Sequence, residues 1–144
     1  MRKFLSVTMF LLFGLLISIP GYLAGQDGMK QTSTGLKYQI SKVSQDTSKP
    51  RTGDWITFNM RYTAKVHGKD TMLFDSKTGL KGEPVRIELP PSDFRGDLYE
   101  GIRMLSPGDS GMFAIDSDSL FLKTFRMPKR PEMIDSNTAI CFYI

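Results

Sequence analysis

The chain has 144 residues, which is the length of a single domain. Its formal net charge at pH 7 is only +4 and its basic residues are scattered, so the sequence predicts no nucleic-acid partner. Cys141 is the one cysteine, so no disulfide can form within the chain.

The first 25 residues have the layout of a secretory signal peptide. Two basic residues, Arg2 and Lys3, precede an almost unbroken apolar run over residues 4–19. This run is shorter than the roughly 20 residues that a transmembrane helix needs. We therefore expect an exported protein in which segment 1–25 is either cleaved or kept as a short membrane anchor. The polar residues 26–34 are expected to form a tether.

Alternating apolar residues predict strands in the first half of the domain. Residues 36–43 indicate a first strand. Residues 54–66 give the clearest pattern, because every even-numbered residue from Ile56 to Val66 is apolar. A turn at residues 67–70 then predicts a return strand that includes residues 72–74.

The middle of the chain predicts one strand followed by one short helix. Apolar residues alternate with charged ones over residues 85–89, which is typical of a strand. Apolar residues and a glycine then recur at helical spacing over residues 98–105, and Ser92 or Asp93 is expected to cap this helix.

The end of the chain predicts two more strands, at residues 111–115 and 138–144, joined by a long connection over residues 117–137. Several strands with one helix indicate an α+β domain, in which the helix packs on one face of an antiparallel sheet. No metal is expected, because the nearby acidic residues Asp109, Asp116 and Asp118 lack the spacing of a calcium loop.

Five short motifs, in this order and at these spacings, resemble the FKBP-type peptidyl-prolyl isomerases. They are Arg61-Tyr62-Thr63, Phe74-Asp75-Ser76, Tyr99-Glu100-Gly101-Ile102, Pro107-Gly108-Asp109 and Ile140-Cys141-Phe142. The resemblance covers residues 35–144. It implies a curved antiparallel sheet, or half-barrel, wrapped around one short helix. The last strand of such a domain usually runs a few residues beyond the position of Ile144, so this sequence can stop inside its last strand.

The resemblance also implies a site. A shallow apolar pocket between sheet and helix holds the substrate proline, and its polar anchor matches Asp75, which a bond from the Tyr62 phenol is expected to orient. The matching walls are Tyr62, Phe74, Leu98, Phe121 and Phe142. Further substrate contacts match Val85, Phe94 and Arg95. No cofactor is implied, and the partners are proline-containing polypeptides in the periplasm or cell envelope.

Three of the departures from the family pattern concern the rings of the pocket. Leu98 stands where a tryptophan is usual, Val85 stands where a phenylalanine is common, and Phe121 lacks the hydroxyl group of the usual tyrosine. The resemblance therefore implies a wider and less aromatic pocket, with lower activity or a different substrate preference.

The predicted chemistry needs only apolar walls and a few hydrogen bonds. Amide resonance sets a barrier of about 18–20 kcal/mol to rotation, and a dry pocket weakens the preference for the planar, polarised form. An isomerase that assists folding is our first interpretation. A binding or chaperone module with little turnover is the second, and a structural envelope domain is the third. Core packing of Tyr62, Phe74 and Phe142, and a simple turn or cap at Asp75, remain open alternatives.

Overall fold

The computed structural model describes residues 28–42 and 44–144, so the predicted export signal lies outside the described residues. The predicted tether is described from residue 28 onward. Part of it is regular, because the short strand Lys30–Gln31 pairs with the following strand. Within the described ranges, no helix is long and apolar enough to cross a membrane.

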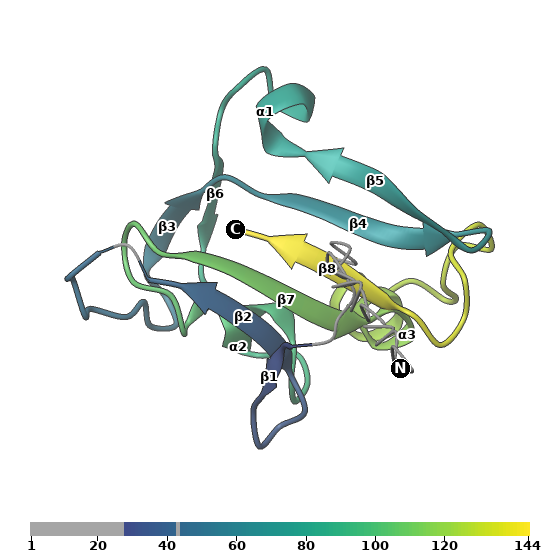
Figure 1. The fold of residues 1–144 in the computed structure, drawn as a ribbon, viewed down its shortest axis with the longest axis horizontal. Coiled ribbons are helices and arrows are strands. Elements are labelled where there is room, and N and C mark those ends of the chain that lie inside the picture. The colour runs from purple at the N-terminus through teal and green to yellow at the C-terminus, as the bar shows by residue number, and fades with distance from the viewer. Residues whose placement is uncertain (1–27, 43) are drawn as a thin grey trace, which may run out of the picture.

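Strands dominate the described chain (Figure 1). In chain order the elements are β1 (Lys30–Gln31), β2 (Lys37–Ser41), β3 (Trp55–Phe58), β4 (Arg61–Val66), β5 (Lys69–Asp75), α1 (Ser76–Gly79), β6 (Val85–Glu88), α2 (Leu98–Ile102), β7 (Ser110–Asp116), α3 (Ser117–Ser119), the π-helix η1 (Leu120–Thr124) and β8 (Ala139–Tyr143). A six-stranded sheet has the order β1-β2-β7-β8-β4-β5, and β3 pairs with β6 in a second, two-stranded sheet. All of these pairings are antiparallel, as the sequence predicts.

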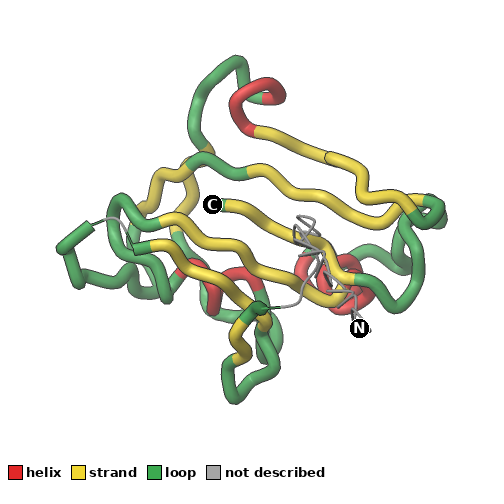
Figure 2. The backbone as a smooth tube through the Cα atoms, in the orientation of Figure 1, coloured by secondary structure: helices red, strands yellow, loops and turns green. Residues whose placement is uncertain are grey.

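The helices α2 and α3 lie on the same side of the six-stranded sheet (Figure 2). The core forms where the α2 region and η1 meet this face of the sheet. Its buried members are Leu36, Ala64, Leu105, Phe113, Ile115, Leu120, Phe121, Ile134, Ile140 and Phe142. A mostly antiparallel sheet with a helix on one face is the α+β architecture that the sequence predicts.

The long strand predicted over residues 54–66 is two strands, β3 and β4, which belong to different sheets. The ladder breaks at Met60, where the backbone N–H donates to the Ser76 hydroxyl group at 3.0 Å. The Ser76 backbone N–H in turn donates to the Met60 carbonyl group at 2.8 Å. The predicted faces are nevertheless correct, because the even-numbered side chains of β3 and β4 are the more buried ones.

Two local predictions are wrong. The helix cap is Asp97 rather than Ser92 or Asp93, because the Asp97 carboxylate accepts a hydrogen bond from the backbone N–H of Glu100 in the first turn of α2. The connection over residues 117–137 is also not a plain loop, because it contains α3 and η1. Its first turn is capped by Asp116, which accepts a hydrogen bond from the Ser119 backbone N–H.

Candidate functional site

Five aromatic side chains form a continuous row across the inner face of the six-stranded sheet. The register pairs Tyr38 with Phe113, Phe113 with Phe142, Phe142 with Tyr62, and Tyr62 with Phe74. Residues directly opposite each other in antiparallel strands have side chains on the same face. We call these five residues the aromatic row. It brings together Tyr62, Phe74 and Phe142, which lie far apart in the sequence.

The rings at one end of the aromatic row contact each other directly. The centroids of Tyr62 and Phe74 are 5.5 Å apart, with an interplanar angle of 20°. The centroids of Tyr62 and Phe142 are 5.1 Å apart, with an angle of 42°. These separations are typical of stabilising aromatic pairs. Partial burial of the Tyr62 side chain raises the pKa of its phenol.

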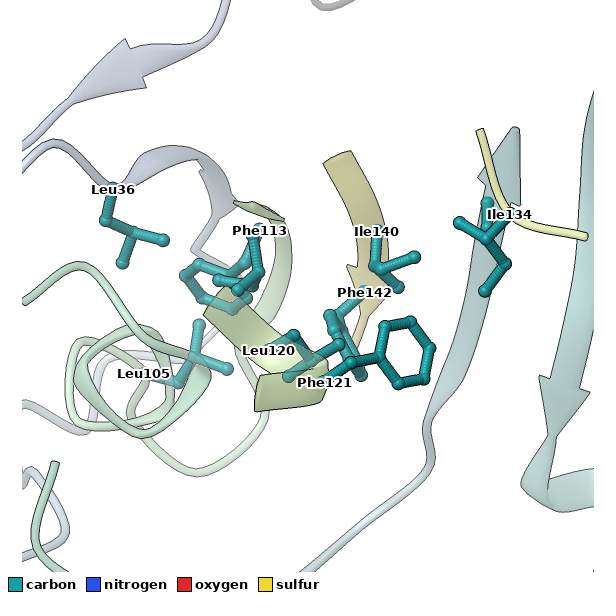
Figure 3. Packing of buried hydrophobic residues seen from close by; sticks show 10 residues of the cluster. Leu36, Leu105, Phe113, Leu120, Phe121, Ile134, Ile140 and Phe142 are labelled. Atoms are coloured by element: carbon teal, nitrogen blue, oxygen red, sulfur yellow. The ribbon is translucent and has the colours of Figure 1, made fainter. Parts of the chain in front are cut away.

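Burial changes along the aromatic row. Phe113 and Phe142 are 0% and 2% exposed, so they belong to the core. Tyr62 and Phe74 are half-buried, so a bound chain can reach them. Phe121, from η1, is 9% exposed and lies in the same cluster as Phe142 (Figure 3). Phe121 and Phe142 therefore lie beneath this region and do not form part of its open surface.

Leu98 and Phe94 contact the same core cluster from the helical side of the site. Both are half-buried and pack against the buried core, Leu98 from the first position of α2 and Phe94 from the turn before it. Tyr62 packs against this core from the sheet. Phe121 and Phe142 thus belong to the buried core, Tyr62, Phe94 and Leu98 each pack against it, and Phe74 stacks on Tyr62.

The turn that carries Phe94 is held by partly buried hydrogen bonds. Asp97 is 0% exposed, and its carboxylate accepts from the backbone N–H of Asp93 at 2.6 Å and of Glu100 at 2.8 Å. The Glu100 carboxylate accepts from the Gly96 N–H at 3.0 Å and from the Thr34 hydroxyl group. The capping role of Asp97 and Glu100 was not predicted, although an Asp three residues before a Glu is a recognised capping signal.

Asp75 does not lie where the resemblance implies. It pairs with Arg61 in the register, and the alternation of β5 places it on the face opposite Phe74. Its carboxylate accepts from the Lys77 backbone N–H at 2.8 Å and caps α1. Among the described residues, no hydrogen bond joins it to the Tyr62 phenol, so the expected orientation of Asp75 by Tyr62 is wrong. The alternative interpretation of a local cap is the one the structure supports.

Val85 and Arg95 lie outside the apolar part of the candidate site. Val85 is half-buried and pairs with Phe58 in the two-stranded sheet, outside the cluster described above. The Arg95 side chain is exposed, and its guanidinium donates to the Ser33 carbonyl group at 3.5 Å.

Three of the hollows on the described surface lie away from the aromatic row, which lines none of these three. One of about 550 Å³ lies on the outer face of the sheet and includes Asp75. A second, of about 570 Å³, lies between β3 and the end of α2. A third, of about 330 Å³, includes Phe94 and Arg95. The candidate site is a partly exposed apolar surface, and Phe94 connects it to the third hollow.

No acidic, histidine or cysteine cluster suited to a metal ion is found within the described residues. What this arrangement can supply is an apolar surface backed by a rigid core. Such a surface removes water from a bound segment and makes few hydrogen bonds of its own.

Comparison with known proteins identifies the fold. No protein-family model matches the chain, and no curated protein matches it. Solved structures do match, among them FkpA from Escherichia coli, with 22% sequence identity and a TM-score of 0.54. The match covers 81% of this chain and 49% of FkpA, so the chain spans about half the length of that structure. At this identity the likeness establishes the fold alone, and that fold is FKBP-like.

Proposed function

We propose that this chain is a peptidyl-prolyl cis-trans isomerase that acts on proline-containing segments of polypeptides. One observation carries the proposal: the half-buried rings of Tyr62 and Phe74 continue an aromatic row whose next two members, Phe142 and Phe113, are buried in the core. The FKBP-like fold and the likeness to FkpA support the same class of function.

The reaction would need no proton transfer. An X-Pro bond has cis and trans forms of similar energy, separated by the high barrier of amide resonance. A proline seated against Tyr62, Phe74 and Leu98 would lose water from its imide carbonyl. The planar, polarised ground state would then lose more stabilisation than the twisted form, which lowers the barrier.

The rigid surroundings would hold the walls in place. The Tyr62 ring is fixed between Phe74 and Phe142, and the turn before α2 is fixed by Asp97. Pre-organised walls do not have to be ordered when the substrate binds, so more of the binding free energy remains for twisting the bond.

Exchange spectroscopy tests the proposal. NMR would measure cis-trans exchange of an Ala-Ala-Pro-Phe peptide with the full chain, with Phe74→Ala and with Leu98→Ala. We expect both variants to lower the catalysed rate about tenfold, which corresponds to roughly 1.4 kcal/mol of lost transition-state binding. Met72→Ala is the matched control, because Met72 is 50% exposed on the same strand as Phe74. Equal rates in all four proteins, or no acceleration by any of them, would rule out the proposal.

A second candidate function is a binding or chaperone module with little turnover. The position of Asp75 favours it, because the carboxylate that the family motif supplies as an anchor serves here as the cap of α1. The same NMR experiment separates the two functions. Binding without catalysis would shift peptide signals through contact with Phe74 and Leu98 and leave the exchange rate unchanged.

We further propose that the protein works in the cell envelope after export. The apolar run over residues 4–19, preceded by two basic residues, supports this location. Cell fractionation tests it, with an Arg2→Glu, Lys3→Glu variant as the comparison. We expect the variant to accumulate in the cytoplasm, and an unchanged distribution would contradict export through this segment.

A further inference from the structure

The hollow beside Phe94 has two cationic side chains in its wall. It lies between the turn that carries Phe94 and Arg95 and the segment from the end of β7 to η1, which contributes Lys123. The Lys123 ammonium group lies 5.2 Å from the centroid of the Phe94 ring. One face of that ring therefore lies under a positive charge, while the residue as a whole packs against the apolar core.

The acidic groups around this hollow already accept hydrogen bonds or ion pairs. Asp116 lines it, but its carboxylate accepts from the Ser119 backbone N–H at 2.8 Å. Asp93, next to Phe94, has a guanidinium nitrogen of Arg126 at 3.5 Å. The Glu100 carboxylate is bound by a backbone N–H and a hydroxyl group. The hydrogen bonds do not cancel the charge of these acids. Among the residues that line the hollow, Arg95 and Lys123 are cationic and Asp116 is anionic, so the lining keeps a net positive charge.

We infer that this cationic hollow selects proline segments that carry an acidic residue next to the proline. The inference rests on the proposed function and extends it, because Phe94 links the hollow to the apolar cluster of Tyr62 and Leu98. With the proline on that cluster next to Phe94, we expect a carboxylate one residue away to approach Arg95 and Lys123, which line the same hollow as Phe94. A lysine at the same place meets two like charges.

The selectivity is expected to be modest and sensitive to salt. Arg95 and Lys123 are exposed, and exposed ion pairs contribute little because water screens them. Such charges act mainly on specificity and on the rate of encounter. At 1 M salt the screening length falls to about 3 Å, from about 10 Å at 0.1 M, so the preference should almost disappear.

Matched peptides test the inference with the full chain. The set is Ala-Glu-Pro-Phe, Ala-Gln-Pro-Phe, Ala-Lys-Pro-Phe, Ala-Ala-Pro-Glu and Ala-Ala-Pro-Gln, with affinity and cis-trans exchange measured by NMR in parallel. At low salt we expect one or both glutamate peptides to bind about threefold more tightly than the glutamine peptide of the same series. Arg95→Gln and Lys123→Gln should each weaken the preference, and the double variant should abolish it. Lys129→Gln is the control, because Lys129 pairs with Glu132 and does not line the hollow.

Affinity and exchange rate test the charge preference and the proposed function separately. Faster exchange with equal affinity for glutamate and glutamine peptides would overturn the charge preference and leave the isomerase intact. A glutamate preference without faster exchange would support the preference and overturn the isomerase. A preference that survives the double variant, or that Lys129→Gln removes equally well, would also overturn the inference. Failure of every peptide to bind would overturn both.

Discussion

Gly101 on helix α2 lies directly against the ring of Phe113 on strand β7. A Cβ atom added at Gly101 would lie 2.6 Å from Cδ1 of Phe113, closer than real Cβ contacts come. A Cβ atom added at Gly111 would also lie too close to this ring, at 2.7 Å from its Cε2 atom. The absence of these two side chains therefore sets how closely α2 approaches the sheet. That approach determines where Leu98, at the start of α2, meets the apolar cluster.

Gly101→Ala should destabilise the fold, although alanine is the better helix former. Overpacking a tight core contact typically costs about 1–3 kcal/mol, and Phe113 is fully buried, so its ring has little room to move. Urea denaturation would measure the loss. Adding Phe113→Leu should recover part of it, because the two changes share one contact.

Gly79→Ala is the comparison, since its new Cβ would lie 3.2 Å from the half-buried Phe74 ring and should cost much less. Equal losses at Gly79 and Gly101 would contradict this account.

Phe142→Ala should act on stability before it acts on function. The ring is 2% exposed, and removal of a buried phenylalanine costs about 3–5 kcal/mol. Phe74 is half-buried, so Phe74→Ala should cost only about 1–2 kcal/mol. Urea denaturation of both variants checks the order. A smaller loss for Phe142→Ala than for Phe74→Ala would place Phe142 at the open surface instead of in the core.

Asp75→Asn should leave both stability and activity nearly unchanged. Asparagine caps a helix about as well as aspartate, so it can still accept from the Lys77 N–H. We expect a change of less than about 0.5 kcal/mol in the free energy of unfolding. NMR exchange with the proline peptide should change by less than about twofold. A large loss of exchange in a stable variant would show instead that the charge of Asp75 anchors the substrate.

The faces of the strands could be predicted because alternation is local. The side that carries Tyr62 is the buried side of β4, as the pattern over residues 54–66 predicts. The break at Met60 could not be predicted in this way, because it depends on hydrogen bonds to Ser76, a residue 16 positions away. The aromatic row likewise depends on the register of separate strands, which no single motif contains.

Asp75 shows where a family motif and a local pattern conflict. Neighbouring residues of a strand point to opposite faces, so alternation separates Asp75 from Phe74. The resemblance instead placed both at one pocket, and the register agrees with alternation. The cap at Asp97 is the opposite case, because its signal is local: an Asp three residues before a Glu, here Asp97 and Glu100.

Asp97→Ala should be among the more costly single changes outside the apolar core. It would leave the backbone N–H groups of Asp93 and Glu100 without their buried acceptor, at about 1–3 kcal/mol for each unsatisfied group. Asp116→Ala is the matched control, since that exposed cap accepts from one N–H group only and should cost about 1 kcal/mol. Urea denaturation would measure both. Similar losses for the two variants would mean that the bonds of Asp97 contribute no more than an ordinary cap.

The free energy of unfolding should fall at alkaline pH because two tyrosines ionise. Burial raises the pKa of Tyr62 above its ordinary value of 10.0. Burial, together with the negative charges of Asp93 and Asp97, raises the pKa of Tyr99. Because both pKa values are higher in the folded state, their contribution is fully present below pH 10 and is lost as the pH rises through the folded pKa values.

Urea denaturation across alkaline pH, with Tyr62→Phe and Tyr99→Phe as comparisons, would measure this effect. Phenylalanine cannot ionise, so each variant should lose less stability than the parent above pH 10, while lysines titrate equally in all three proteins. Absorbance at the phenolate band should also show some of the tyrosines of the folded chain ionising late. Parallel stability curves for the parent and both variants would mean that neither phenol is desolvated, and the poorly solvated surface proposed for the substrate proline at Tyr62 would then be absent.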